Sequence, residues 1–142
     1  MNYYALLAGI AIAVFVVARF KKTKLEKRKW VYPVLLATFP IYYWIFAVYA
    51  SDYSALMSEV GIGLAFFFLA YIAYRLNSVT GLILLATGYI LHGGYDVIHN
   101  SFFINPGTPV WWPEFCGAVD VFIGVYLLYF GVSVKGRAPK IA

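Results

Sequence analysis

Long apolar runs alternate with short polar connections along the whole chain. The apolar runs cover about 2–20, 31–50, 54–74, 79–99 and 113–134, and each is close to the roughly 20 residues that a membrane-spanning helix needs. Backbone polar groups in hydrocarbon must bond within their own segment, which a helix achieves. The pattern therefore predicts one all-α domain over residues 1–142, a polytopic membrane bundle of about five transmembrane helices. Short connections favour consecutive helices that are antiparallel neighbours.

Composition agrees with a protein that lies in lipid. Hydrophobic residues make up 63% of the chain and charged residues only 12%, against roughly 25% charged residues in soluble domains. The net charge of +5 does not indicate nucleic acid, because the basic residues flank apolar runs and form no patch with exposed aromatic rings. Membrane lipids are the expected partners.

The basic residues predict how the chain is oriented. All eleven lie in or beside three places: the first connection, the third connection and the tail. They are Arg19, Lys21, Lys22, Lys24, Lys27, Arg28, Lys29, Arg75, Lys135, Arg137 and Lys140. Five crossings put all three places on one side, which the positive-inside rule makes cytoplasmic. We therefore expect a multi-pass protein of the cell membrane with its N-terminus outside and its C-terminus in the cytoplasm.

Small residues predict where helices touch. Ala5, Gly9 and Ala13 recur every four positions in the first apolar run, and Gly117, Gly124 and Gly131 recur every seven in the fifth. Such stripes typically allow two membrane helices to approach closely.

One polar constellation stands out within the apolar runs. His92, Asp96 and His99 are spaced i, i+4 and i+7, so on a helix they share a face about 60° wide. Asp120 lies on the glycine stripe of the fifth run, about 10 Å below its outer end and at the same depth as His92. The predicted arrangement is a ladder, with His92 near Asp120 and His99 near Glu114 at the mouth.

Buried ionisable groups in a membrane are costly and usually paired, and they often mark function. Two imidazoles with nearby carboxylates suit Zn²⁺ or another divalent metal, with His92, His99 and Asp120 as ligands. Asp96 or Glu114 would then orient a ligand or act as acid or base. The same residues could instead relay protons, bind a polar ligand, or merely tie two helices together.

Two further features admit two interpretations each. Glu59 could supply another ligand or base, but the favoured interpretation is a carboxylate that stabilises a helix N-terminus. The outer connection, residues 100–113, contains Pro106-Gly107 and several large aromatic residues. It could cover the polar residues as a lid or serve only as an aromatic anchor in the bilayer surface.

The segment from His92 to His99, followed by Trp111-Trp112-Pro113-Glu114-Phe115-Cys116 and Asp120, resembles an uncharacterised bacterial family of short multi-pass membrane proteins. The resemblance covers mainly the last two helices. It implies that the His/Asp segment and the Trp-Pro segment belong together, and it implies no activity.

Three functions remain open on the sequence, and whether the protein is an enzyme is one of the open points. The first is a metal-dependent enzyme that acts on a lipid-like substrate at an outer-leaflet His/carboxylate pocket. The second is a proton-linked module that binds or transports a cation or small solute, which would require a homo-oligomer because five helices make a thin barrier. The third is an accessory subunit of a larger membrane complex.

Overall fold

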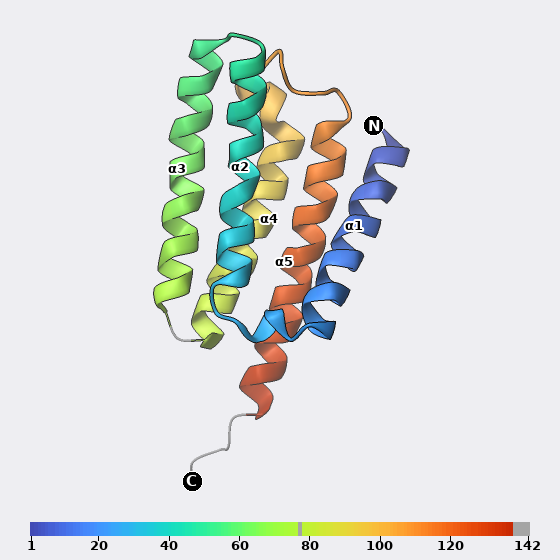
Figure 1. Cartoon of the computed structure of the whole chain (residues 1–142), viewed down its shortest axis with the longest axis vertical. Helices are drawn as coiled ribbons and strands as arrows, with labels where there is room; N and C mark the ends of the chain where they lie inside the picture. The colour runs from blue at the N-terminus through green and yellow to red at the C-terminus, as the bar shows by residue number, and fades with distance from the viewer. Residues whose placement is uncertain (77, 138–142) are drawn as a thin grey trace.

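The computed structural model describes residues 1–76 and 78–137, and all of their long elements are helices. The elements are α1 Tyr3–Lys22, the short 3-10 helix η1 Leu25–Lys27, α2 Val31–Tyr49, α3 Tyr53–Arg75, α4 Ser78–Phe102 and α5 Trp112–Arg137 (Figure 1). Within the described ranges, five helices are long and apolar enough to cross a membrane, which confirms the predicted class. Lys140 and the side chains of Lys135 and Arg137 lie outside the described residues.

Polar side chains define where two of the helices begin. The side chain of Asn2 accepts a hydrogen bond from the amide of Ala5 at 3.1 Å, and Asp52 does the same for Ala55 at 2.9 Å. Each cap satisfies an amide that the first turn of a helix leaves unpaired. α4 continues to Phe102, beyond its predicted end near residue 99. His99 is therefore held on a continuous helix.

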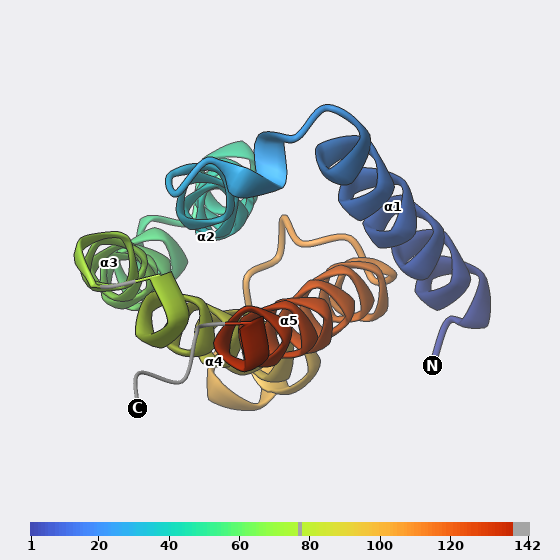
Figure 2. The ribbon, with the colours of Figure 1, turned by 90° about the horizontal axis from the view of Figure 1, so that it is seen from below.

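The five helices form an arc in the order α1, α5, α4, α3, α2, and α2 also touches α4 across the arc. Figure 2 shows α1 and α2 at the two ends of this arc, joined by the segment that contains η1. The expectation that consecutive helices are neighbours is therefore wrong for α1 and α2. The segment between them is long enough to reach across the bundle, and the small-residue stripe of α1 packs on α5 instead.

The predicted small-residue stripes lie at helix contacts. A Cβ atom on Gly93 would lie 3.1 Å from the carbonyl oxygen of Gly117, and one on Gly117 would lie 3.2 Å from the carbonyl oxygen of Gly93. In α1, a Cβ atom on Gly9 would collide with the backbone of Phe115. The backbones of α4 and α5 are thus in direct contact at the depth of the polar residues.

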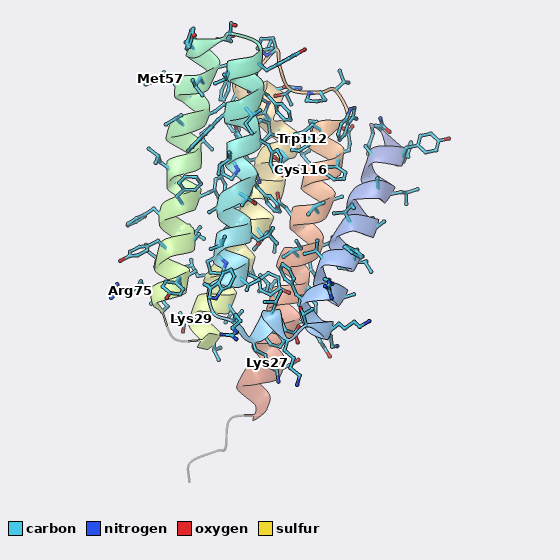
Figure 3. The ribbon with its side chains drawn as sticks, in the orientation of Figure 1. Lys27, Lys29, Met57, Arg75, Trp112 and Cys116 are labelled. Carbon is cyan, nitrogen blue, oxygen red and sulfur yellow. The ribbon has the colours of Figure 1, made fainter. Side chains whose placement is uncertain are left out.

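The outer surface of the bundle is apolar and its basic residues gather at one end. Leu7, Phe15 and Phe68 are each more than 60% exposed, as side chains that face lipid would be. Figure 3 shows Lys27 and Lys29 near one end, with Trp112 far from them. The grouping of the described basic residues at one end is as the sequence predicts.

Candidate functional site

His92, Asp96 and Asp120 form a compact buried group, here called the His92 cluster. Nδ1 of His92 lies 2.8 Å from Oδ2 of Asp120 and 3.5 Å from Oδ2 of Asp96. The three residues are at most 1% exposed. One ligand atom from each of them lies within 4.8 Å of the others. Two carboxylates and one imidazole therefore share a site from which water is excluded.

The positions of the cluster follow from helix geometry. The i, i+4 spacing stacks His92 and Asp96 on one face of α4. The glycine contact with α5 then brings Asp120 to the same depth, because the Cβ position of Gly93 is 3.0 Å from the Cβ of Asp120. The predicted pairing of His92 with Asp120 is confirmed by their hydrogen bond.

Aromatic side chains enclose the His92 cluster. The hydroxyl of Tyr43, on α2, donates a hydrogen bond of 2.7 Å to Oδ1 of Asp96. The rings of Phe66 and Phe39 lie 4.7 and 5.9 Å from the imidazole of His92, measured between centroids. In such apolar surroundings the charges of the cluster interact more strongly than they would in water. Tyr43 fixes the orientation of one carboxylate and leaves its second oxygen facing His92.

The polar atoms of the His92 cluster are not fully paired. Among the described residues, no hydrogen-bond partner is present for Nε2 of His92, Oδ2 of Asp96 or Oδ1 of Asp120. A buried polar atom without a partner costs roughly 1–3 kcal/mol, and more when the group is charged. Native proteins rarely leave several such atoms in one place without a reason. This shortage of partners makes the cluster a candidate site for a ligand.

A second buried group, the Glu59 cluster, consists of Glu59, Tyr95, His99 and Asn105. Oε1 of Glu59 lies 2.8 Å from Nε2 of His99 and accepts a hydrogen bond of 2.9 Å from Nδ2 of Asn105. Oε2 accepts a hydrogen bond of 2.8 Å from the hydroxyl of Tyr95. Both carboxylate oxygens are thus paired, and the cluster joins α3, α4 and the outer loop. Its full pairing suits a structural tie.

Tyr43 stands between the two clusters. Its hydroxyl bonds Asp96, while its ring stacks on the imidazole of His99 with 4.6 Å between centroids. Its backbone oxygen accepts a hydrogen bond of 3.1 Å from Asn105. The clusters are neighbours, but the group of potential ligand atoms found in the described residues is His92, Asp96 and Asp120, without His99.

The expected partnership of His99 with Glu114 is wrong. His99 pairs with Glu59, whereas Oε1 of Glu114 accepts a hydrogen bond from the backbone amide of Asn2 at 3.0 Å. The cause is the order of helices around the bundle, in which α3 lies on one side of α4 and α5 on the other. The favoured interpretation of Glu59 is also wrong, because its side chain is 2% exposed and bonded to three others.

Sequence reasoning missed three members of these networks: Tyr43, Tyr95 and Asn105. The two tyrosines resemble the many other aromatic residues of a membrane helix. Asn105 had a weak signal, because it is a polar residue within an aromatic loop. It is 3% exposed, whereas Ile104 beside it is 74% exposed. The outer loop is therefore attached to the bundle by a polar side chain that points inward.

Comparisons with protein-family models, with curated proteins and with solved structures returned no match for this chain. Its function is therefore inferred from the geometry of the two clusters.

Proposed function

We propose that this integral membrane protein binds one divalent metal ion, in the first place Zn²⁺, through His92, Asp96 and Asp120. The observation that carries the proposal is the convergence of three buried ligand atoms within 4.8 Å of one another. Imidazole nitrogen and carboxylate oxygen are donors that zinc takes readily. Tyr43 would hold Asp96 in place through the hydrogen bond to its other oxygen.

Charge balance supports a divalent ion. If both carboxylates of the His92 cluster were ionised, a protonated imidazole would still leave one negative charge in the apolar interior. Burial of an unbalanced charge is strongly unfavourable. A divalent cation with a neutral imidazole and two carboxylates gives a neutral site, and it gives Oδ2 of Asp96, which has no hydrogen-bond partner among the described residues, a partner.

The two distances from Nδ1 of His92 to the carboxylates require only a small adjustment. Ligand atoms around tetrahedral zinc lie about 3.4 Å apart when each bond is about 2.1 Å long. The 3.5 Å between Nδ1 of His92 and Oδ2 of Asp96 already fits, whereas the 2.8 Å to Asp120 would have to lengthen. Side-chain rotation is enough for a change of about 0.6 Å. The metal would replace the direct hydrogen bond between His92 and Asp120.

The proposed ligand set differs from the expected one by a single residue. Asp96 takes the place of His99, because His99 is already bonded to Glu59. Glu114 receives no acid or base role, since its carboxylate bonds the start of the chain.

A lipid-like substrate extends the proposal. A groove of about 680 Å³ runs between α1 and α5 and is lined mainly by apolar residues, among them Val97, Gly117 and Val121. Val97 and Val121 follow Asp96 and Asp120 directly in the chain, and a Cβ atom on Gly117 would lie 3.8 Å from the Cβ of Asp96. An acyl chain in this groove would therefore lie against the groove side of α4 and α5, with the metal on the other side of these helix backbones. Zinc can polarise an ester or amide carbonyl for hydrolysis, so this activity would require the carbonyl and a water molecule to reach the buried His92 cluster.

A proton-linked module is the second candidate function. The observation that favours it is the 2.8 Å hydrogen bond between His92 and Asp120, which needs one proton and no metal. A cluster with two carboxylates and one imidazole can hold that proton at several atoms, as proton relays in membranes do. The two candidates differ in whether a metal is bound.

Metal content separates them. We expect plasma mass spectrometry of the detergent-purified protein to find about one zinc per chain, as one site requires, and less than about a tenth of that in Asp120→Asn. Glu114→Gln is the matched control, because it removes a carboxylate of the same helix outside the cluster. Metal-free wild-type protein, or equal zinc in Asp120→Asn, would refute the metal site.

The same proposal includes the setting of the site. We place the protein in the cell membrane with the basic end in the cytoplasm, which puts the His92 cluster in the outer half of the bilayer. A monomer is sufficient for the metal site, because all three ligands come from one chain. Solute transport would instead require a homo-oligomer or a larger complex.

A further inference from the structure

A second cavity lies at the basic end of the bundle and is lined by none of the residues of the His92 cluster. It has a volume of about 420 Å³, a size typical of small-ligand pockets, and it is bounded by η1, α2, α3, α4 and α5. Its rim carries the consecutive basic residues Lys27, Arg28 and Lys29, two of which Figure 3 labels. Its inner wall is apolar and includes Leu82, Leu85 and Phe130.

A buried tyrosine, Tyr32, is among the residues that line this cavity. Tyr32 is 2% exposed, and its hydroxyl has no hydrogen-bond partner among the described residues. Its backbone is fixed, because the hydroxyl of Tyr89 donates a hydrogen bond of 2.8 Å to the Tyr32 carbonyl. A buried hydroxyl without a partner is unfavourable, so a ligand that accepts a hydrogen bond from it would be bound more tightly.

The charges of the cavity fit an anion. The lining residues include three basic side chains and one carboxylate, that of Glu26. Glu26 already accepts a hydrogen bond of 2.5 Å from the hydroxyl of Tyr126. The Nζ of Lys29 lies 5.6 Å from the ring centroid of Tyr74, which holds this ammonium group beside α3. The rim is therefore positive on balance, and its cations are placed at the membrane surface.

We propose that this cavity binds one anionic phospholipid, with the phosphate at Lys27, Arg28 and the Tyr32 hydroxyl and the upper part of an acyl chain against the apolar wall. The combination of a basic rim and an apolar interior suits a lipid better than a free anion. Basic pockets between membrane helices are known to hold acidic headgroups in this way. The site is distinct from the metal site, because none of the residues that line the cavity belongs to the His92 cluster.

The test uses the full-length protein, delipidated in detergent and titrated with phosphatidylglycerol or with phosphatidylcholine of the same acyl chains. Native mass spectrometry reports the first bound lipid. We expect wild-type protein to bind phosphatidylglycerol at least about tenfold more tightly than phosphatidylcholine, since charged contacts dominate such sites. The triple variant Lys27→Gln, Arg28→Gln, Lys29→Gln should lose this preference.

A matched control separates a site from general surface charge. Lys21→Gln, Lys22→Gln, Lys24→Gln removes the same charge from the same end but outside the cavity, and it should keep the preference. Tyr32→Phe removes one oxygen from the wall and should weaken phosphatidylglycerol binding by about three- to tenfold, as expected for loss of one hydrogen bond. Because it changes so little, Tyr32→Phe tests the site even if a triple variant does not fold.

Three results would overturn the proposal. Equal loss of the phosphatidylglycerol preference in the two triple variants would show that the preference arises from general surface charge. Unchanged phosphatidylglycerol binding by Tyr32→Phe would show that the lipid does not bind in this cavity. Displacement of the lipid by millimolar inorganic phosphate alone would identify a free anion, not a lipid, as the ligand.

Discussion

Nδ1 of His92 lies 2.8 Å from Oδ2 of Asp120, and this contact joins α4 to α5 inside an apolar bundle. A second carboxylate, that of Asp96, approaches the same nitrogen to 3.5 Å. One imidazole thus faces two carboxylates, and the buried group contains more negative than positive charge unless a proton or a cation is added. This charge imbalance makes the His92 cluster the place to test for a bound metal ion or proton.

Tyr43 should control metal affinity without touching the metal. Its hydroxyl bonds Oδ1 of Asp96, and loss of such a supporting hydrogen bond typically lowers metal affinity by about 10- to 100-fold. We expect Tyr43→Phe to show this loss in a competition titration with a fluorescent zinc chelator. Tyr42→Phe is the control, since Tyr42 is 43% exposed and lies beside Tyr43 in the chain. Equal zinc affinity in the wild type and Tyr43→Phe would show that Tyr43 does not support the metal site.

Glu59 should contribute stability and not metal binding. Glu59→Gln removes the charge that pairs with His99, and breaking a buried pair costs about 3 kcal/mol. We expect SDS-driven unfolding in mixed micelles, followed by tryptophan fluorescence, to show a free energy of unfolding lower by about this amount. The zinc content should stay at the wild-type level. Loss of zinc from a folded Glu59→Gln variant would place Glu59 in the metal site.

Asp52→Asn provides the comparison for this experiment. Asp52 caps α3 about two turns before Glu59, and asparagine caps helices about as well as aspartate. The variant removes one carboxylate near the same end of the bundle and should unfold like the wild type.

Asn105 should hold the outer loop against the bundle. Its amide nitrogen donates hydrogen bonds to Glu59 and to the Tyr43 backbone, and Asn105→Ala removes both of these buried bonds. We expect Asn105→Ala to raise amide hydrogen exchange in residues 103–111 by at least about tenfold, corresponding to roughly 1.4 kcal/mol of lost local stability. Ile104→Ala, at an exposed neighbouring position, should leave exchange unchanged. A similar increase in both variants would contradict an anchoring role.

The predicted orientation can be tested with single cysteines in a Cys116→Ala background. Tyr53 is 73% exposed at the start of α3, and Lys22 ends α1 at the opposite, basic end. A membrane-impermeant maleimide should label Tyr53→Cys in intact cells and Lys22→Cys only after permeabilisation. The reverse pattern would invert the assignment of the two sides.

The spans and one contact between helices could be predicted from the sequence for physical reasons. Lipid requires long apolar helices, and the spacing of His92 and Asp96 fixes their common face whatever the neighbours are. The pairing of His92 with Asp120 followed from equal depth and from the glycine stripe of α5. Depth along a helix is readable from residue number, because each residue adds about 1.5 Å.

The remaining contacts depend on how helices are arranged around the bundle, which residue spacing does not specify. His99 and Glu114 lie at compatible depths, but the packing of α3 against α4 places Glu59 beside His99. Tyr43 could not be identified for the same reason, since its role depends on α2 reaching α4 across the arc. The role of a tyrosine in a membrane helix can be assigned only once its hydrogen-bond partner is known.

Zinc binding by equilibrium dialysis tests the central claim most directly, with the metal-free wild type, Asp96→Asn and His99→Ala compared side by side. Asp96→Asn keeps the shape of the side chain and removes its charge, whereas His99→Ala leaves the His92 cluster in place. The proposed site predicts about one zinc per chain in the wild type and in His99→Ala, and none in Asp96→Asn at the same free zinc concentration. Loss of zinc in His99→Ala with retention in Asp96→Asn, or no uptake by the wild type, would contradict it.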